Sequence, residues 1–358
     1  MSAASHLEIS GKNGPISIAT EGGKAHGVQA GAKGSNANGQ DRSEISLADN
    51  IKVVTTGSRS VGLHAIDGGT INSFADIETS GMNGFGIFAE SYSKITQDAG
   101  NIVTTGYYGH ALIANNDIAN AEAGKVTAIG TVIETGGDWA HGAFADNAGA
   151  IFLDGAKITT EGSRAFGILA AKNSTVSGQA AVFTINDKSH AVQAGANGST
   201  GDGSDKSVVN LNAGSTVSTA GSDAFALHAI DGGTINSSAD IKTSGKNGFG
   251  IFAESASTIN QTGGSVTTDG GYGHGLIAND DRKTTGGKVV ATDVKVQTNK
   301  DWSYGAFADN GGHFQPAWQA CTTESRNSVQ DNIARPLSHA IHLSQLMQFS
   351  NRSHPWWV

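Results

Sequence analysis

Histidine is the side chain best suited to acid–base and metal chemistry near neutral pH. Five histidines of this chain occupy one recurring sequence position: His26, His110, His141, His190 and His274. In other recurrences that position holds Phe85, Phe166, Phe225, Phe249 or Tyr304. A second repeated position is mixed in the same way, with Gln29, His64, Phe88 and His228. Positions shared by His and Phe are typical of packing, and a zinc site needs clustered ligands, so we expect no metal and no cofactor.

Paired carboxylates would indicate glycoside hydrolysis, because that reaction needs two of them at a defined separation. The candidates all occupy another repeated position: Glu90, Asp146, Glu254 and Asp309. Elsewhere that position holds Ile66, Asn115 or Ala171. The tripeptide at 273–275, Gly-His-Gly, is similar to one in polygalacturonases, but there the paired aspartates precede it. We therefore expect no catalytic residue. The alternative is a carbohydrate-active β-helix enzyme or a tailspike-like protein.

The elements that carry these side chains are short repeats. A six-residue pattern (small, variable, Gly or Ala, apolar, variable, Ala) occurs eleven times, beginning with AHGVQA at 25–30 and ending with SYGAFA at 303–308. Its sixth residue is always alanine: Ala30, Ala65, Ala89, Ala114, Ala145, Ala170, Ala194, Ala229, Ala253, Ala278 and Ala308. The spacings of 35, 24, 25, 31, 25 and 24 residues then begin again, which indicates a duplicated unit of about 164 residues.

Each repeat of about 24 residues contains three short alternating stretches, each of the length of a strand. Three strands and three turns per repeat predict one rung of a right-handed, single-stranded parallel β-helix. With about 4.8 Å between rungs, eleven rungs span roughly 50 Å. The alanines and the apolar residues two positions earlier should face inward, since small beside large side chains fill a narrow interior. We also expect Thr79 to stack on Thr105, and Thr243 on Thr268.

The composition suits such a solenoid, which buries small side chains in thin layers. The chain has 358 residues with 50 Gly, 15% charged and 6% aromatic residues. Low charge argues against disorder. The net charge of −9 is scattered without a basic stripe, so we expect no nucleic acid partner. No run of 18 apolar residues predicts a membrane helix.

The pattern G-x-x-A-x-G-[VIL]-x-A followed by GG-x-I resembles the repeats of pertactin-like autotransporter passengers, which use type V secretion. GSRAFGILA at 162–170 and GSRSVGLHAIDGGTI at 57–71 carry the resemblance, which covers about residues 8–312. It implies a passenger that is displayed on the cell surface or secreted through the outer membrane, with a translocator barrel in the full-length protein. The start, MSAASHLEIS, has no signal-peptide pattern, and we expect this chain to lack the barrel.

We expect two domains: passenger repeats at 1–312 and an aberrant tail at 313–358. The tail has no Gly and no Lys but contains three of the four Pro, three of the five Trp and the only Cys, Cys321. The repeat ends within a rung, so a frameshifted or disordered tail is favoured. The alternative is a genuine cap, with one amphipathic helix over 337–349.

Four rungs are longer than the helix requires, so their extra residues should leave it as loops at 34–43, 115–124, 198–207 and 279–287. Loops on a rigid scaffold often carry function. Candidate partner-contact residues in them are Asn36, Asp41, Asn116, Asp117, Asp202, Asp205, Asp280 and Asp281. The leading hypothesis is a non-enzymatic adhesin that meets a host cell surface, matrix or neighbouring bacterial cells. The competing non-enzymatic hypothesis is a structural stalk.

Overall fold

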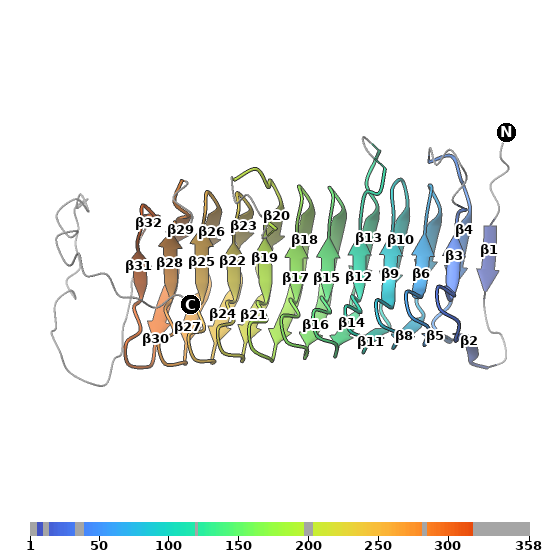
Figure 1. Cartoon of the computed structure of the whole chain (residues 1–358), viewed down its shortest axis with the longest axis horizontal. Helices are drawn as coiled ribbons and strands as arrows, with labels where there is room; N and C mark the ends of the chain where they lie inside the picture. Colours follow the sequence, from blue (N-terminus) through green and yellow to red (C-terminus); the bar gives the residue numbers. More distant parts are fainter. Residues whose placement is uncertain are drawn as a thin grey trace. The chain divides into compact units, whose positions relative to one another are not determined.

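The computed structural model describes residues 6–9, 14–32, 39–118, 121–196, 203–280 and 285–317, and every regular element in them is a β-strand. Successive strands pair in parallel with strands of the next coil, which defines a parallel β-helix (Figure 1). The predicted fold is confirmed. Each coil contributes one strand to each of three columns, which we call the motif column, the second column and the third column.

The motif column is an 11-stranded parallel sheet built from the recurring six-residue pattern. Its strands are β3 (Val28–Ala30), β6 (Val61–Ala65), β9 (Phe85–Ala89), β12 (Leu112–Ala114), β15 (Ala143–Ala145), β17 (Ile168–Ala170), β19 (Val192–Ala194), β22 (Leu227–Ala229), β25 (Ile251–Glu254), β28 (Leu276–Asn279) and β31 (Ala306–Ala308). Eleven strands correspond to the eleven recurrences of the pattern.

The second and third columns form one 21-stranded sheet, because two long strands belong to both. The second column contains β1 (His6–Ile9), β4 (Glu44–Leu47), β7 (Thr70–Ser73), β10 (Lys94–Asp98), β13 (Lys125–Ile129), β16 (Ala150–Thr160), β18 (Thr175–Thr184), β20 (Val208–Leu211), β23 (Thr234–Ser237), β26 (Thr258–Thr262), β29 (Lys288–Thr292) and β32 (His313–Ala317). The third contains β2 (Ile16–Thr20), β5 (Ile51–Thr55), β8 (Asp76–Thr79), β11 (Asn101–Thr104), β14 (Val132–Thr135), the C-terminal halves of β16 and β18, β21 (Thr216–Thr219), β24 (Asp240–Thr243), β27 (Ser265–Thr268) and β30 (Lys295–Thr298).

The interior is a stack of matched layers. In the motif column Ala65 lies opposite Ala89, and Ala145 lies opposite Ala114 and Ala170. The alanines at this position from Ala30 to Ala278 are 0–1% exposed, and the apolar residues two positions earlier point inward with them. Ala308 keeps the register with Ala278 but is exposed, because β31 is the last described strand of its sheet.

The long loops at 31–43 and 195–207 each begin at a position that only glycine can occupy. Gly31 and Gly195 have φ of 87° and 98°. A Cβ on them would lie 1.9 Å from the Ile66 carbonyl oxygen and 1.7 Å from that of Ile230, respectively. Any side chain would therefore meet the backbone of the next coil.

Three details differ from the sequence-based expectations. Thr79 lies opposite Thr104 and not Thr105, whereas Thr243 does lie opposite Thr268. In β16 and β18 two expected strands merge into one, with a bulge between Asp154 and Ala156 where Gly155 adopts a φ of 69°. Strand β32 pairs with β29, so parallel pairing continues five residues beyond position 312. The remainder of the tail, with the alternative of a capping helix at 337–349, lies outside the described residues.

Candidate functional site

The outer face of the motif column carries two adjacent rows of rings, interrupted at some coils by aliphatic or amide side chains such as Val61 and Gln193. Along each strand, the residues that carry these rings alternate with the inward-facing residues. His64 therefore projects from one side of β6, and Leu63 and Ala65 project from the other. Rings of successive coils stack closely: the centroids of His190 and Phe225 are 4.5 Å apart with a 7° angle between the planes. Phe225 stacks on Phe249 at 4.8 Å and 1°. The predicted packing positions are thus two adjacent ladders of aromatic and imidazole rings.

The five histidines of the first ladder share a specific backbone contact, and we call them the imidazole ladder. In each, the ring nitrogen Nδ1 accepts the backbone N–H of the equivalent residue one coil further on. His110 Nδ1 accepts from His141 at 2.9 Å, and His141 Nδ1 accepts from Phe166 at 3.0 Å. The remaining bonds run from Val61 to His26 at 3.2 Å, from Phe225 to His190 at 3.0 Å and from Tyr304 to His274 at 3.0 Å. An accepting Nδ1 requires a neutral ring protonated on Nε2.

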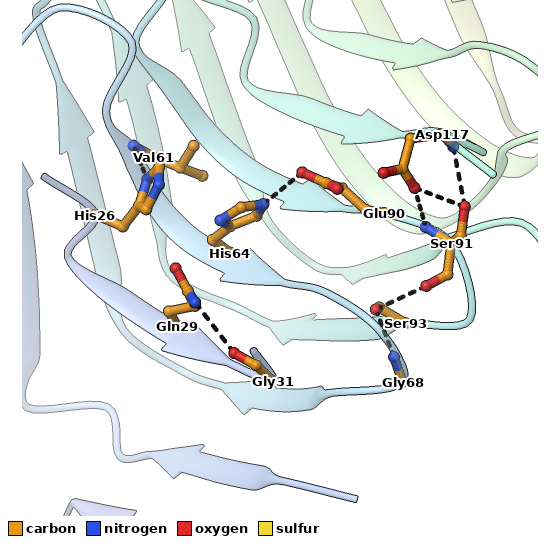
Figure 2. Close-up of polar contacts among 10 residues, drawn as sticks. All are labelled: His26, Gln29, Gly31, Val61, His64, Gly68, Glu90, Ser91, Ser93 and Asp117. Carbon is orange, nitrogen blue, oxygen red and sulfur yellow. Dashed lines mark hydrogen bonds and ion pairs between the residues drawn. The ribbon is translucent and has the colours of Figure 1, made fainter. Parts of the chain in front are cut away.

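The two histidines of the second ladder contact carboxylates instead. His64 Nε2 lies 2.8 Å from Glu90 Oε1 (Figure 2), and 164 residues later His228 Nε2 lies 2.8 Å from Glu254 Oε1. These contacts show that the duplicated unit preserves side-chain geometry as well as the fold. Three of the four candidate carboxylates contact a basic side chain: Glu90 and Glu254 contact a histidine, and Asp146 Oδ2 contacts Lys172 at 2.9 Å.

Burial makes the imidazole ladder hard to protonate. Desolvation lowers the pKa of His110 from 6.5 to about 4. Desolvation, and then repulsion from a neighbouring histidine, hold the pKa of His141 and of His190 well below the ordinary value. The pKa of His26 is lowered by burial and by His64 against the opposing effect of Glu90, and burial lowers that of His274. The neutral form that the hydrogen bonds require is thus also the form that burial favours.

All four long connections leave the coil at one corner, between the motif and second columns (Figure 1). They link β3 to β4, β12 to β13, β19 to β20 and β28 to β29. The corresponding turn from β6 to β7 needs only residues 66–69. Gly39 donates its N–H to Asp67 Oδ1 at 2.8 Å, and Gly203 donates to Asp231 Oδ1 at 2.9 Å, so equivalent loops are held in the same way in both copies.

Asp41 and Asp205, two of the candidate contact residues, shape their own loops. Asp205 is 6% exposed, and its carboxylate accepts five hydrogen bonds, four of them from backbone N–H groups. Burial raises its pKa, but the bonds from Ser207 and from the backbone outweigh burial and lower it. Asp41 accepts from the N–H groups of Ala32 and Ser43 and is only partly buried.

The other candidate contact residues divide between buried and exposed positions. Ser91 Oγ lies 2.7 Å from Asp117 Oδ1 (Figure 2), which ties this loop to the coil before it. Ser91 Oγ also lies 2.6 Å from Asn116 Oδ1. Asp117 is exposed, whereas Asp280 is 6% exposed. Three further candidates lie outside the described residues: Asn36, Asp202 and Asp281.

The sequence analysis missed a second exposed surface, at the corner between the third and motif columns. Tyr108 stacks on Trp139 at 6.0 Å, and the Arg164 guanidinium lies 5.1 Å from the centre of the Trp139 ring. Tyr108 is 38% exposed, and its equivalent in the second copy, Tyr272, is 48% exposed. The recurrence of tyrosine and tryptophan at turn positions of the repeat could have predicted this surface from the sequence.

No metal centre or membrane helix emerges from the part of the chain that the structure describes. In those residues no three His, Cys, Asp or Glu side chains are grouped as metal ligands would be. The same residues contain no helix with the length and apolar character that crossing a bilayer requires.

The three strand columns, the alanine interior and the ring ladders define the class of fold, a parallel β-helix solenoid. The chain is similar to Vag8, a Bordetella autotransporter passenger with a pertactin-like β-helix, in the cryo-EM structure of the Vag8–C1 inhibitor complex. The TM-score is 0.65 at 19% sequence identity, over 86% of this chain and 74% of that chain. No protein-family model and no curated protein matches the sequence. At this identity the similarity establishes the shared fold.

Proposed function

We propose that the chain is a segment of an autotransporter passenger that is exposed at the cell surface or secreted, and that it binds a partner without catalysis. The observation that carries the proposal is the loop corner: four long connections leave a regular scaffold at one edge, where a short turn suffices in other coils. The Vag8 in the similar structure is in complex with C1 inhibitor, which supports a host protein, cell surface or matrix as the kind of partner.

Several spaced loops would suit a partner that is contacted at more than one point. Equivalent loops in the two copies are six coils apart, or roughly 29 Å at about 4.8 Å per coil. Linked weak contacts strengthen each other through effective concentration. We propose that the exposed surface of these loops, including Asp117, makes the contacts, while buried Asp205 and Asp280 maintain loop shape.

Shortening the loops tests this proposal. Each of the four connections is replaced by the four-residue turn at 66–69, and binding to host cells and to matrix is measured. We expect a loss of at least about tenfold, because multivalent contacts are lost together. A matched variant, Trp139→Ser, alters the aromatic corner and should bind as the unaltered chain does. Full binding by the loop variant with an intact fold would favour the stalk, and loss in Trp139→Ser alone would move the site to the aromatic corner.

We further propose that the chain does not cleave polysaccharides. A retaining or inverting glycosidase needs two carboxylates across one bond, but Glu90 contacts His64 and Asp146 contacts Lys172. Purified chain should release no reducing ends from pectin or a bacterial glycan. Turnover that disappears in Asp146→Asn would instead establish the carbohydrate-active alternative.

A further inference from the structure

The imidazole ladder connects consecutive coils where their backbones bend. At Phe166 both backbone groups bond to the preceding coil: the N–H donates to His141 Nδ1 at 3.0 Å, and the carbonyl accepts from Gly142 at 3.0 Å. The strands of the motif column here are only three residues long, as in β12, β15 and β17. Each imidazole bond therefore adds one side-chain contact to the backbone bonds between neighbouring coils on this face.

Protonation and these bonds are mutually exclusive. An imidazolium carries hydrogen on both nitrogens and cannot accept through Nδ1, so a protonated His141 would direct its N–H at the N–H of Phe166. The bond must break, and the backbone donor of the next coil loses its partner. His110 and His141 stack 4.7 Å apart, so a second proton would add repulsion between like charges.

We propose that the imidazole ladder is an acid-responsive joint, which holds adjacent coils together while its rings are neutral and releases them when the rings take up protons. The central members are His110 and His141, which are 8% and 7% exposed, together with His190. Among the described residues the third column has no histidine in this role: its side-chain acceptors are carboxylates such as Asp76 and Asp240, and its strands are four or five residues long, as in β11 and β5. Release is thus expected to open the motif column first.

Few other titratable groups face the ladder, and each can be named. His26 contacts His64, which is paired with Glu90. His190 contacts His228, whose Nε2 faces Glu254 and whose Nδ1 lies 3.2 Å from Gln193 Oε1. His110 and His141 face each other and the rings of Phe85, Phe144 and Phe166. His274 packs against Phe249, Tyr304 and Phe307. Glu90 and Glu254 therefore reach the ladder only through His64 and His228. They make no direct contact that would stabilise a protonated ring of His110, His141 or His190.

The direction of the pH effect follows from the lowered pKa values. A histidine whose pKa is lower in the folded than in the unfolded chain stabilises the fold above pH 6.5, and that stability is lost as pH falls toward the folded pKa. For His110, with a folded pKa of about 4, the folding equilibrium should weaken about 20-fold between pH 7 and pH 5. The lowered pKa values of His141 and His190 should weaken folding in the same direction. Asp205 has a lowered pKa and stays ionised over this range, so it does not confound the measurement.

Asparagine provides the matched substitution, because its Oδ1 can take the place of Nδ1 as an acceptor and does not titrate. The full chain and the variant H110N/H141N/H190N are unfolded in urea at pH 7 and pH 5. We expect the chain to lose stability steeply between these values and the variant to lose much less. H313N, which replaces an exposed histidine of β32, should retain the full pH dependence. Equal pH dependence in the chain and the triple variant would overturn the proposal.

Nitrogen-15 NMR of the histidines decides the question even where the triple variant does not fold. The ladder rings of the unaltered chain should be neutral Nε2–H tautomers at pH 7, and His110 should titrate near pH 4. Hydrogen exchange, corrected for its intrinsic pH dependence, should accelerate at Phe166 and Phe225 on acidification before it does in β14. Ladder histidines that titrate near 6.5 without faster exchange would show that the rings only pack.

Discussion

Replacing Ala145 by glutamate is expected to be among the most damaging single substitutions in this chain. Ala145 is 0% exposed and lies between Ala114 and Ala170 in the alanine column. A glutamate there would place a carboxylate without a cation in a layer that holds only a methyl group. Burial of an unpaired charge together with overpacking should lower the free energy of unfolding by on the order of 5 kcal/mol.

Phe152→Glu is the matched control for Ala145→Glu, because it adds the same carboxylate at a position on β16 that is 46% exposed. Urea unfolding followed by circular dichroism should show a large loss for Ala145→Glu and a change within about 1 kcal/mol for Phe152→Glu. Limited proteolysis should then cut the Ala145 variant in the coils around β15. If both variants unfold at the same urea concentration as the unaltered chain, the glutamate at 145 must be solvated, and the inward assignment of this column is wrong.

The alanine column could be predicted from the sequence because the same residue, alanine, occupies the same motif position in every repeat and so defines the register. A parallel stack places equivalent residues opposite each other, so eleven alanines at the same motif position were enough to order the interior. The position of the loops followed from the same count, since residues beyond the minimal coil must leave it. Where the turns differ in length between coils, counting residues from the motif alanine does not predict which residues pair. Thr79 is 14 residues after Ala65, but Thr104 is 15 after Ala89, so spacing alone does not pair them.

The contacts of the imidazole ladder were beyond the sequence for a different reason. The recurrence of His with Phe correctly indicated packing, but it carries no information on where Nδ1 points. That direction depends on the bend at Gly142, directly after His141, which brings the ring under the N–H of Phe166. The role of Asp205 was also concealed, because its five donors come from three segments that meet only in the folded chain. From the sequence alone, an aspartate in a loop rich in Gly, Ser and Asp is expected to be exposed to solvent.

Removing the carboxylate of Asp205 is expected to destabilise its loop and the coil beneath it. Oδ2 accepts from the backbone N–H of Lys172 at 2.9 Å and of Ala196 at 2.8 Å, and Oδ1 accepts from Ser207 N–H at 2.8 Å and Ser207 Oγ at 2.5 Å. A further bond comes from Asn173. In Asp205→Ala these donors lose their acceptor in a largely buried site, which should cost about 3 kcal/mol in the free energy of unfolding.

The duplication supplies the control, since Asp41 is the same residue 164 positions earlier. Asp41 is less buried, and the backbone N–H groups that donate to it come from Ala32 and Ser43. Water can replace these bonds, so Asp41→Ala should cost about 1 kcal/mol. Because the pKa of Asp205 is lowered, its stabilisation is present above the unfolded pKa of 3.8 and is lost as pH falls through the folded value. The difference between Asp205→Ala and the unaltered chain, measured by urea unfolding, should therefore shrink below pH 4. Equal losses at Asp41 and Asp205, or a difference that persists in acid, would show that the carboxylate does not organise this loop.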